Sequence, residues 1–172
     1  EKTFLTTESC CETYIDAFDM LLVLDTDIAP NNFFNEVLHN KNAQPVPLFS
    51  MIYGKHSILY GSICRFCDPV DVFEYKFMRN ILWGIWPTIE GFAGEEIEDK
   101  ASSKYFDVVK KGTDFFKERK EEFLYARLCA IPDIECDDAV LEWNVNGEKF
   151  TRTYPAIIAT QWEYENGEKA YF

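Results

Sequence analysis

Apolar positions in the first half of the chain follow two different spacings. Residues 2–7 place Phe and Leu among β-favouring threonines, which predicts a strand. Residues 12–24 repeat apolar side chains at helical spacing and predict a short helix or helical turn. Residues 48–53 form a compact apolar run ended by Gly54, which predicts a second strand buried on both faces, as in a parallel sheet. Strands that alternate with helices indicate an α/β fold.

Helical spacing continues through the middle of the chain. A helix capped by Asn32 is expected before the second strand, and another is expected to begin at Asp71 and to end before Pro87. The apolar stripe of the latter is Phe73, Phe77, Ile81 and Ile85. A long charged helix is expected from Ser102 or Ser103 to about residue 128, with Gly112-Thr113 as its candidate break. Its charge run 117–122 is interpreted as a solvated face.

The pattern changes near residue 131. Asn-Gly dipeptides at 146–147 and 166–167 each separate two apolar runs, and this dipeptide is the strongest short hairpin signal. We therefore expect a boundary near residues 131–138, between an α/β part and an antiparallel β part. Both chain ends fall inside expected strands, which favours a portion of a larger protein.

Composition supports a folded core and narrows the set of partners. Hydrophobic residues make up 47% of the chain and aromatic residues 16%, unlike a disordered sequence. The formal charge of -13 disfavours nucleic acid and anionic lipid surfaces as partners. No window approaches the ~20 consecutive apolar residues of a spanning helix, so no membrane insertion is expected. Oligomeric state and localisation, cytoplasmic or secreted, stay open.

The six cysteines and two histidines do not predict a metal site. Cys64-Arg65-Phe66-Cys67 has the spacing of two zinc ligands, but no second such pair exists, and the adjacent Cys10-Cys11 would bind one metal poorly. Mostly reduced thiols are expected. Because a glycine-rich phosphate loop is also absent, we expect no cofactor.

Several short motifs follow one another in a recognisable order. An acidic strand end, Thr7-Glu8-Ser9-Cys10-Cys11-Glu12, is followed by Phe18-Asp19. The later motifs are Val46-Pro47-Leu48-Phe49-Ser50-Met51-Ile52-Tyr53, Tyr60-Gly61, Leu82-Trp83-Gly84 and the Pro155 to Trp162 segment. In this order they resemble an uncharacterised family of bacterial glycoside-hydrolase-like barrels that carry a β-sandwich after the barrel. The likeness spans nearly the whole chain, and it depends on the order because each motif alone is weak.

The resemblance implies an incomplete C-terminal part of a (β/α)8 barrel followed by the start of an antiparallel β-domain. Residues 1–130 would be the C-terminal portion of the barrel with trailing helices, and residues 131–172 the first strands of a β-sandwich-like domain. Residues 2–7 and 48–53 would be the last two barrel strands. Cys10-Cys11 and Lys55-His56 depart from the residues usual in the family, so an altered site is also open.

The resemblance also implies a site at the carboxyl ends of the barrel strands. Glu8 follows the first strand and is the candidate catalytic residue, with substrate hydrogen bonding or a structural ion pair as alternatives. Its partner carboxyl group, roughly 5 to 10 Å away, would come from a strand outside this chain. Glu12 is a candidate substrate-binding residue or a local cap. Tyr53, His56 and Trp83 are candidate sugar contacts because aromatic faces cover C–H groups and polar edges bind hydroxyls.

Less specific interpretations accompany these residues. Trp83 and Trp86, three positions apart at an expected helix end, are also typical of a core, and His56 is also typical of a surface loop. The first functional hypothesis is a glycoside hydrolase that cleaves O-glycosidic bonds in an unidentified poly- or oligosaccharide. The alternatives are a catalytically inactive carbohydrate-binding or scaffold protein, or a truncated product without activity.

Overall fold

A computed structural model describes residues 3–7, 12–23, 46–65, 68–90, 103–145 and 147–172. Within these ranges a parallel sheet has the strand order β1–β2–β3–β4. The strands are β1 (Thr6–Thr7), β2 (Met20–Val23), β3 (Ile58–Arg65) and β4 (Ile85–Glu90). Residues Thr7, Leu21, Leu59 and Ile85 are in register across the sheet. The strands therefore all run in one direction, in the order in which they occur in the chain.

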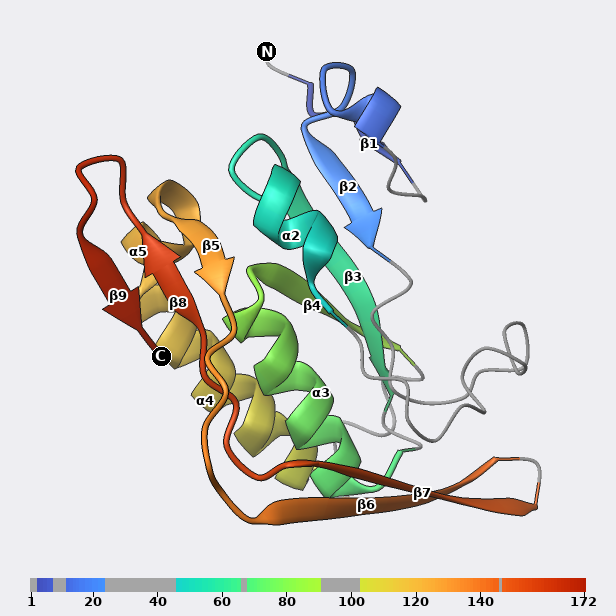
Figure 1. Cartoon of the computed structure of the whole chain (residues 1–172). Helices are drawn as coiled ribbons and strands as arrows, with labels where there is room; N and C mark the ends of the chain where they lie inside the picture. Colours follow the sequence, from blue (N-terminus) through green and yellow to red (C-terminus); the bar gives the residue numbers. More distant parts are fainter. Residues whose placement is uncertain (1–2, 8–11, 24–45, 66–67, 91–102, 146) are drawn as a thin grey trace.

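Helices connect and cover these strands. The 3₁₀ helix η1 is Glu12–Tyr14, and the α-helices are α2 (Leu48–Tyr53), α3 (Val70–Leu82), α4 (Ser103–Glu118) and α5 (Lys120–Tyr125). Helix α3 joins β3 to the parallel strand β4, so β3–α3–β4 is a βαβ unit. Figure 1 shows α3 beside the sheet with α4 along it.

The C-terminal part is antiparallel. Strand β5 (Arg127–Ala130) pairs with β8 (Gln161–Glu163), which pairs with β9 (Lys169–Tyr171). Strands β6 (Asp138–Val145) and β7 (Glu148–Pro155) form a separate ribbon. Figure 1 shows this ribbon crossing the amino-terminal end of α3.

One hydrophobic cluster joins the sheet, the helices and the C-terminal strands. The sheet contributes Leu21, Leu59 and Ile85, α3 contributes Phe73, Phe77 and Ile81, and the later elements contribute Phe123, Leu128 and Trp162. A second cluster places Val72 of α3 against Leu141 and Tyr154 of the β6–β7 ribbon. Residues 131–137, near which a domain boundary was expected, connect β5 to β6, and the larger cluster contains residues from both sides of this connection.

The strongest sequence patterns are confirmed. Phe73, Phe77 and Ile81 do line the buried face of α3, and a charged helix does begin at Ser103. Both Asn-Gly hairpins form, with Gly147 and Gly167 at φ of 84°. At the second turn, Asn166 Oδ1 accepts a hydrogen bond from the backbone N–H of Glu168 at 2.9 Å.

The strand expected at residues 48–53 is wrong, because these residues form α2. The side chains follow helical spacing: Leu48 and Ile52 are exposed, whereas the rings of Phe49 and Tyr53 pack 4.9 Å apart. Pro47 directly precedes the first turn of α2. Backbone N–H groups at this position make no hydrogen bond within a helix, so a proline, which has no N–H, is tolerated there. A short apolar run does not distinguish a strand from a helix, and here the helix is formed.

Three further helix boundaries are corrected. Met20–Val23, expected within a helix, is strand β2, and its side chains alternate between half-buried and buried. Ile85, expected on the helical stripe, lies in β4. Pro87 also lies in β4, and a proline is tolerated there because β4 is an edge strand among the described residues. The charged helix breaks at Arg119 instead of Gly112-Thr113 and is followed by β5 from Arg127. The helix expected at Asn32 lies outside the described residues.

The fold is mixed α/β, as expected, with a parallel sheet and antiparallel strands. The described strands form an open sheet between β1 and β4, and no closed barrel is present among them. The described strands therefore neither form nor rule out the expected barrel.

Gly84 is the residue on which the turn from α3 to β4 depends. Its φ of 72° is a left-handed conformation, and a Cβ built there would lie 2.7 Å from the Trp162 ring. Such a glycine two positions after the last helical residue is a common helix stop. The turn therefore brings the backbone against a buried tryptophan of β8.

We predict that Gly84→Ala lowers the free energy of unfolding by roughly 2 to 5 kcal/mol, from left-handed strain and overpacking together. Gly167→Ala is the matched control, because Gly167 has φ of 84° but no atom within 4 Å of a built Cβ. Gly167→Ala is expected to lower the free energy of unfolding by only about 1 to 2 kcal/mol. Urea unfolding of both variants measures the difference, and equal losses would contradict the proposed Trp162 contact.

Candidate functional site

The carboxyl end of β1 is held by a side chain from β3. The Tyr60 hydroxyl donates a hydrogen bond to the Thr7 carbonyl at 3.2 Å, across the intervening strand β2. Glu8 directly follows Thr7 in the chain, as expected, but Glu8 itself lies outside the described residues. Glu12 is exposed at the start of η1. Tyr60 thus fixes the backbone immediately before the candidate catalytic carboxyl group.

Tyr53 does not follow a parallel strand, contrary to the expectation drawn from residues 48–53. It is the last residue of α2, and its ring is half-buried against Phe49. His56 lies in the short turn after α2, where its backbone N–H bonds to the Tyr53 carbonyl at 2.8 Å. Because β3 starts at Ile58, both residues precede a strand rather than follow one.

A polar cavity of about 340 Å³ lies at the amino-terminal side of β3 and β4. Its walls come from the segment before β2, the turn between α2 and β3, the start of β4 and helix α5. Its polar side chains are Asp16, Asp19, Lys55, His56 and Ser57, and its aromatic ones are Phe18, Trp86 and Phe123. His56 is the predicted site residue that this cavity contains.

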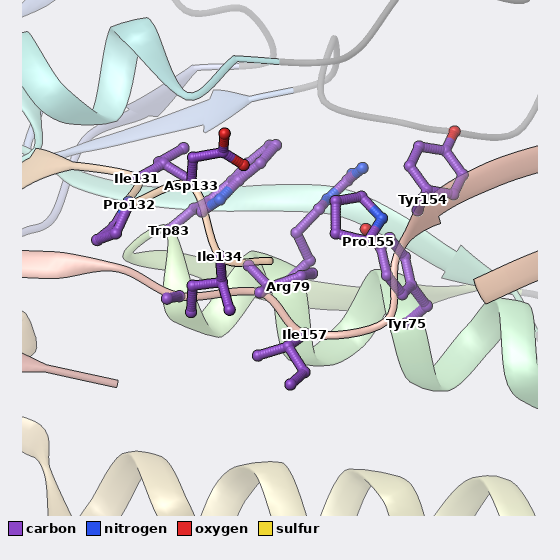
Figure 2. Close-up of a pocket in the computed structure, with 12 residues that line it drawn as sticks. Tyr75, Arg79, Trp83, Ile131, Pro132, Asp133, Ile134, Tyr154, Pro155 and Ile157 are labelled. Carbon is purple, nitrogen blue, oxygen red and sulfur yellow. The ribbon is translucent and has the colours of Figure 1, made fainter. Parts of the chain in front are cut away.

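A second cavity, about 230 Å³, is mostly apolar and lies along α3. Figure 2 shows Tyr75, Arg79 and Trp83 from α3 and its carboxyl end facing the segments 131–134 and 154–159. Isoleucines and prolines of those segments supply most of the remaining wall, with Asp133 as an acidic group. We call this the α3 cleft.

Trp83 contributes to the α3 cleft mainly as a core residue. It is 4% exposed, and the Arg79 guanidinium covers its ring at 4.6 Å from the centroid. Such a cation–π contact occupies the ring face that a sugar would need. Its indole N–H is buried without a hydrogen-bond partner among the described residues. The core alternative for Trp83 therefore fits its surroundings.

Tyr75 is a titratable group of the α3 cleft whose pKa is shifted by its environment. Burial raises the pKa of Tyr75 to about 12, with Arg79 opposing and Tyr154 adding to the shift. The rings of Tyr75 and Tyr154 lie 5.0 Å apart. A phenol in this position stays protonated and serves as a hydrogen-bond donor at neutral pH.

We predict that Tyr75 makes the protein more sensitive to alkali. The unfolded chain loses this phenolic proton near pH 10 and the folded one near pH 12, so folding stability is unaffected below pH 10 and declines between the two values. After solvent screening the loss is on the order of 1 kcal/mol. Tyr75→Phe should lessen the decline in unfolding free energy from pH 9 to 11.5. An unchanged slope would contradict the burial of the phenol.

The described site residues do not converge on one cavity. His56 faces the polar cavity, Trp83 faces the α3 cleft, and Tyr53 is among the wall residues of neither. Trp86, considered beside Trp83 in the sequence, is 44% exposed and lines the polar cavity. The sequence feature that could have distinguished Trp83 from Trp86 is Gly84, which lies in the turn between the end of α3 and the start of β4.

Metal ligands, cysteines and apolar helices are further features of the described part of the chain that bear on function. No group of three or more His, Cys, Asp or Glu side chains there is arranged to hold a metal ion. No disulfide bond joins Cys64, Cys129 and Cys136 within the described residues. None of the helices described has both the length and the apolar character required to cross a bilayer.

Comparisons with known proteins give a coarse family likeness. Residues 1–64 match the family model described as "Domain of unknown function (DUF6259)". A protein of Bacteroides thetaiotaomicron named "Putative glycoside hydrolase" is 27% identical over 183 residues, which cover 99% of this chain. The chain spans 23% of that relative's length. No solved structure matches the chain. The chain is thus similar to a glycoside-hydrolase-like protein along nearly its whole length.

Proposed function

We propose that this chain forms part of a glycoside hydrolase that cleaves O-glycosidic bonds in poly- or oligosaccharides. The observation that carries the proposal is the similarity to the Bacteroides protein over 99% of the chain. Because the chain spans less than a quarter of that relative, the activity would belong to a larger protein of which this is one portion.

The strand order supports a barrel in that larger protein. Strands β1 to β4 are parallel and adjacent in chain order, as consecutive strands of a (β/α)8 barrel are. A doubly wound sheet instead reverses its order at a switch point, and the described strands contain no reversal. In the proposed barrel, residues 1–130 supply C-terminal strands and trailing helices, and residues 131–172 begin the β-domain.

Glu8 is the proposed catalytic carboxyl group. It follows the carboxyl end of β1, the end of the strands at which barrel enzymes place their chemistry. Hydrolysis of a glycosidic bond requires a second carboxyl group on the other side of the bond, which we assign to a strand outside this chain. Tyr60 is a proposed positioning residue, since its hydroxyl restrains the Thr7 carbonyl.

The proposed sugar contacts differ in how accessible they are. Glu12 is exposed and follows β1 in the chain, as Glu8 does, so a glycan bound at Glu8 could reach it. His56 is exposed and Tyr53 is half-buried, but both precede β3, so we do not assign them to the Glu8 site. Trp83 is enclosed, and we assign it a supporting role behind Tyr75 and Arg79 instead of direct stacking on a sugar. No metal or cofactor is part of the proposal.

We predict that Glu8→Gln in the full-length protein lowers kcat by about 10²- to 10⁴-fold on any glycan that the wild type hydrolyses, because general acid–base catalysis contributes that much. Glu12→Gln, the same carboxyl-to-amide change at a proposed sugar contact, should lower kcat less, by at most about ten-fold. Release of reducing ends measures both. If Glu8→Gln retains turnover within a few-fold, Glu8 is not the acid, base or nucleophile.

A wild-type protein that binds glycans without hydrolysing them would instead be the inactive carbohydrate-binding or scaffold protein.

Tyr60→Phe separates positioning from chemistry. It removes the hydrogen bond to Thr7, and we expect a smaller fall in kcat than for Glu8→Gln with an unchanged shape of the pH profile.

A further inference from the structure

The polar cavity at the amino-terminal side of the sheet has a composition suited to a sugar. Its volume of about 340 Å³ falls within the range of small-molecule sites, about 300 to 1,000 Å³. Polar atoms of the backbone and side chains supply most of its exposed wall surface, and an aromatic ring lies beside them. We propose that this cavity is a second carbohydrate-binding site, separate from Glu8, which holds one neutral pyranose ring. The inference rests on the proposed function only for its choice of a carbohydrate ligand.

Trp86 supplies the apolar surface of the proposed site. Its side chain is 44% exposed although it lies in β4, and it lines the cavity together with Phe123. Phe116 meets the Trp86 ring edge-on at 4.7 Å, and Phe116 in turn stacks on Phe123 at 5.4 Å. These contacts fix the orientation of the indole before any ligand arrives. A rigid aromatic ring binds the C–H groups of a pyranose at a low cost in side-chain entropy.

Ser57 supplies an unused hydrogen-bonding group. Its residue is 7% exposed, and its hydroxyl is buried without a hydrogen-bond partner in the described structure. The Ser57 backbone N–H already bonds to the Tyr53 carbonyl at 3.3 Å. A buried hydroxyl without a partner is costly, and a ligand hydroxyl in the cavity would remove that cost. This observation points to a ligand independently of the cavity volume.

The charged groups around the cavity favour a neutral ligand. Lys55 pairs with Glu165, and Asp19 Oδ2 accepts a hydrogen bond from the Leu5 N–H at 3.0 Å. Asp16 and His56 complete the polar wall. An anionic ligand would meet two carboxylates, whereas sugar hydroxyls can donate to a carboxylate and accept from an imidazole or ammonium group. The wall therefore selects hydroxyls over phosphates or carboxylates.

The position of the cavity separates it from the proposed chemistry. His56 and Ser57 precede β3, and Gly84 precedes β4, whereas Glu8 follows β1. In a parallel sheet, residues that precede strands and residues that follow them occupy opposite ends. The second site would therefore hold a glycan chain without taking part in its cleavage.

The test measures binding of neutral sugars to the full-length protein by isothermal titration calorimetry. The probes are glucose, galactose, mannose and xylose with their β-1,4-linked disaccharides. Trp86→Ala is expected to weaken binding at least ten-fold, and Trp86→Phe, which keeps a ring against Phe116, should weaken it less. The exposed Tyr171 provides the matched control, and Tyr171→Ala should bind as the wild type does.

Ser57→Ala guards against a simple folding defect. It should weaken sugar binding several-fold while leaving Tm unchanged or higher, because it removes a buried hydroxyl that lacks a partner. Sugar binding that is equal in the wild type, Trp86→Ala and Ser57→Ala, or absent for every probe, would overturn the inference.

The outcome is separable from that of the proposed function. Trp86-dependent binding in a protein that shows no turnover would remove the hydrolase and keep this site. Turnover that depends on Glu8, without Trp86-dependent binding, would support the hydrolase and remove this second site.

Discussion

The burial of Trp162 connects the parts of this protein. Trp162 belongs to β8, is 3% exposed, and packs edge-on against Phe123 of α5 at 5.1 Å. Its indole N–H is satisfied locally by the Thr160 hydroxyl at 3.2 Å, so the ring enters the core without an unmet polar group. Its far edge lies against Gly84, where a Cβ has no room. The C-terminal strands therefore set the position of the backbone that leads into β4.

That contact also shapes the polar cavity. Gly84, Trp86 and Phe123 all line the cavity, and Trp162 touches the first and the last of them. The aromatic series continues from Phe123 to Phe116 and from there to Trp86. A shift of β8 would thus be transmitted through packed rings to the indole that faces the cavity. In this way the antiparallel strands, which lie outside the parallel sheet, support the walls of the cavity at its amino-terminal side.

Sequence patterns specify some of these elements and leave others open. The stripe of α3 repeats over three turns, and the Asn-Gly turns need positive φ, so both were predictable from local physics. Residues 48–53 were not, because a six-residue run of five apolar side chains and one serine satisfies either period, and the choice depends on what covers it. Burial of Ser50 and exposure of Leu48 come from tertiary packing, which a single sequence does not contain. The same holds for β2, whose four residues end a stretch with helical spacing.

The candidate site was predictable only in part, for a reason that lies in one turn. With one helix running from Asp71 to Trp86, both tryptophans would share a face, and neither could be singled out. Gly84 adopts a left-handed conformation and changes the period from helix to strand between them. Trp83 is then left at the end of α3 under Arg79, whereas Trp86 enters β4 and remains 44% exposed. Since stacking on a sugar needs an open ring face, the accessible aromatic surface belongs to Trp86, and it is the backbone conformation of a neighbouring glycine that decides this.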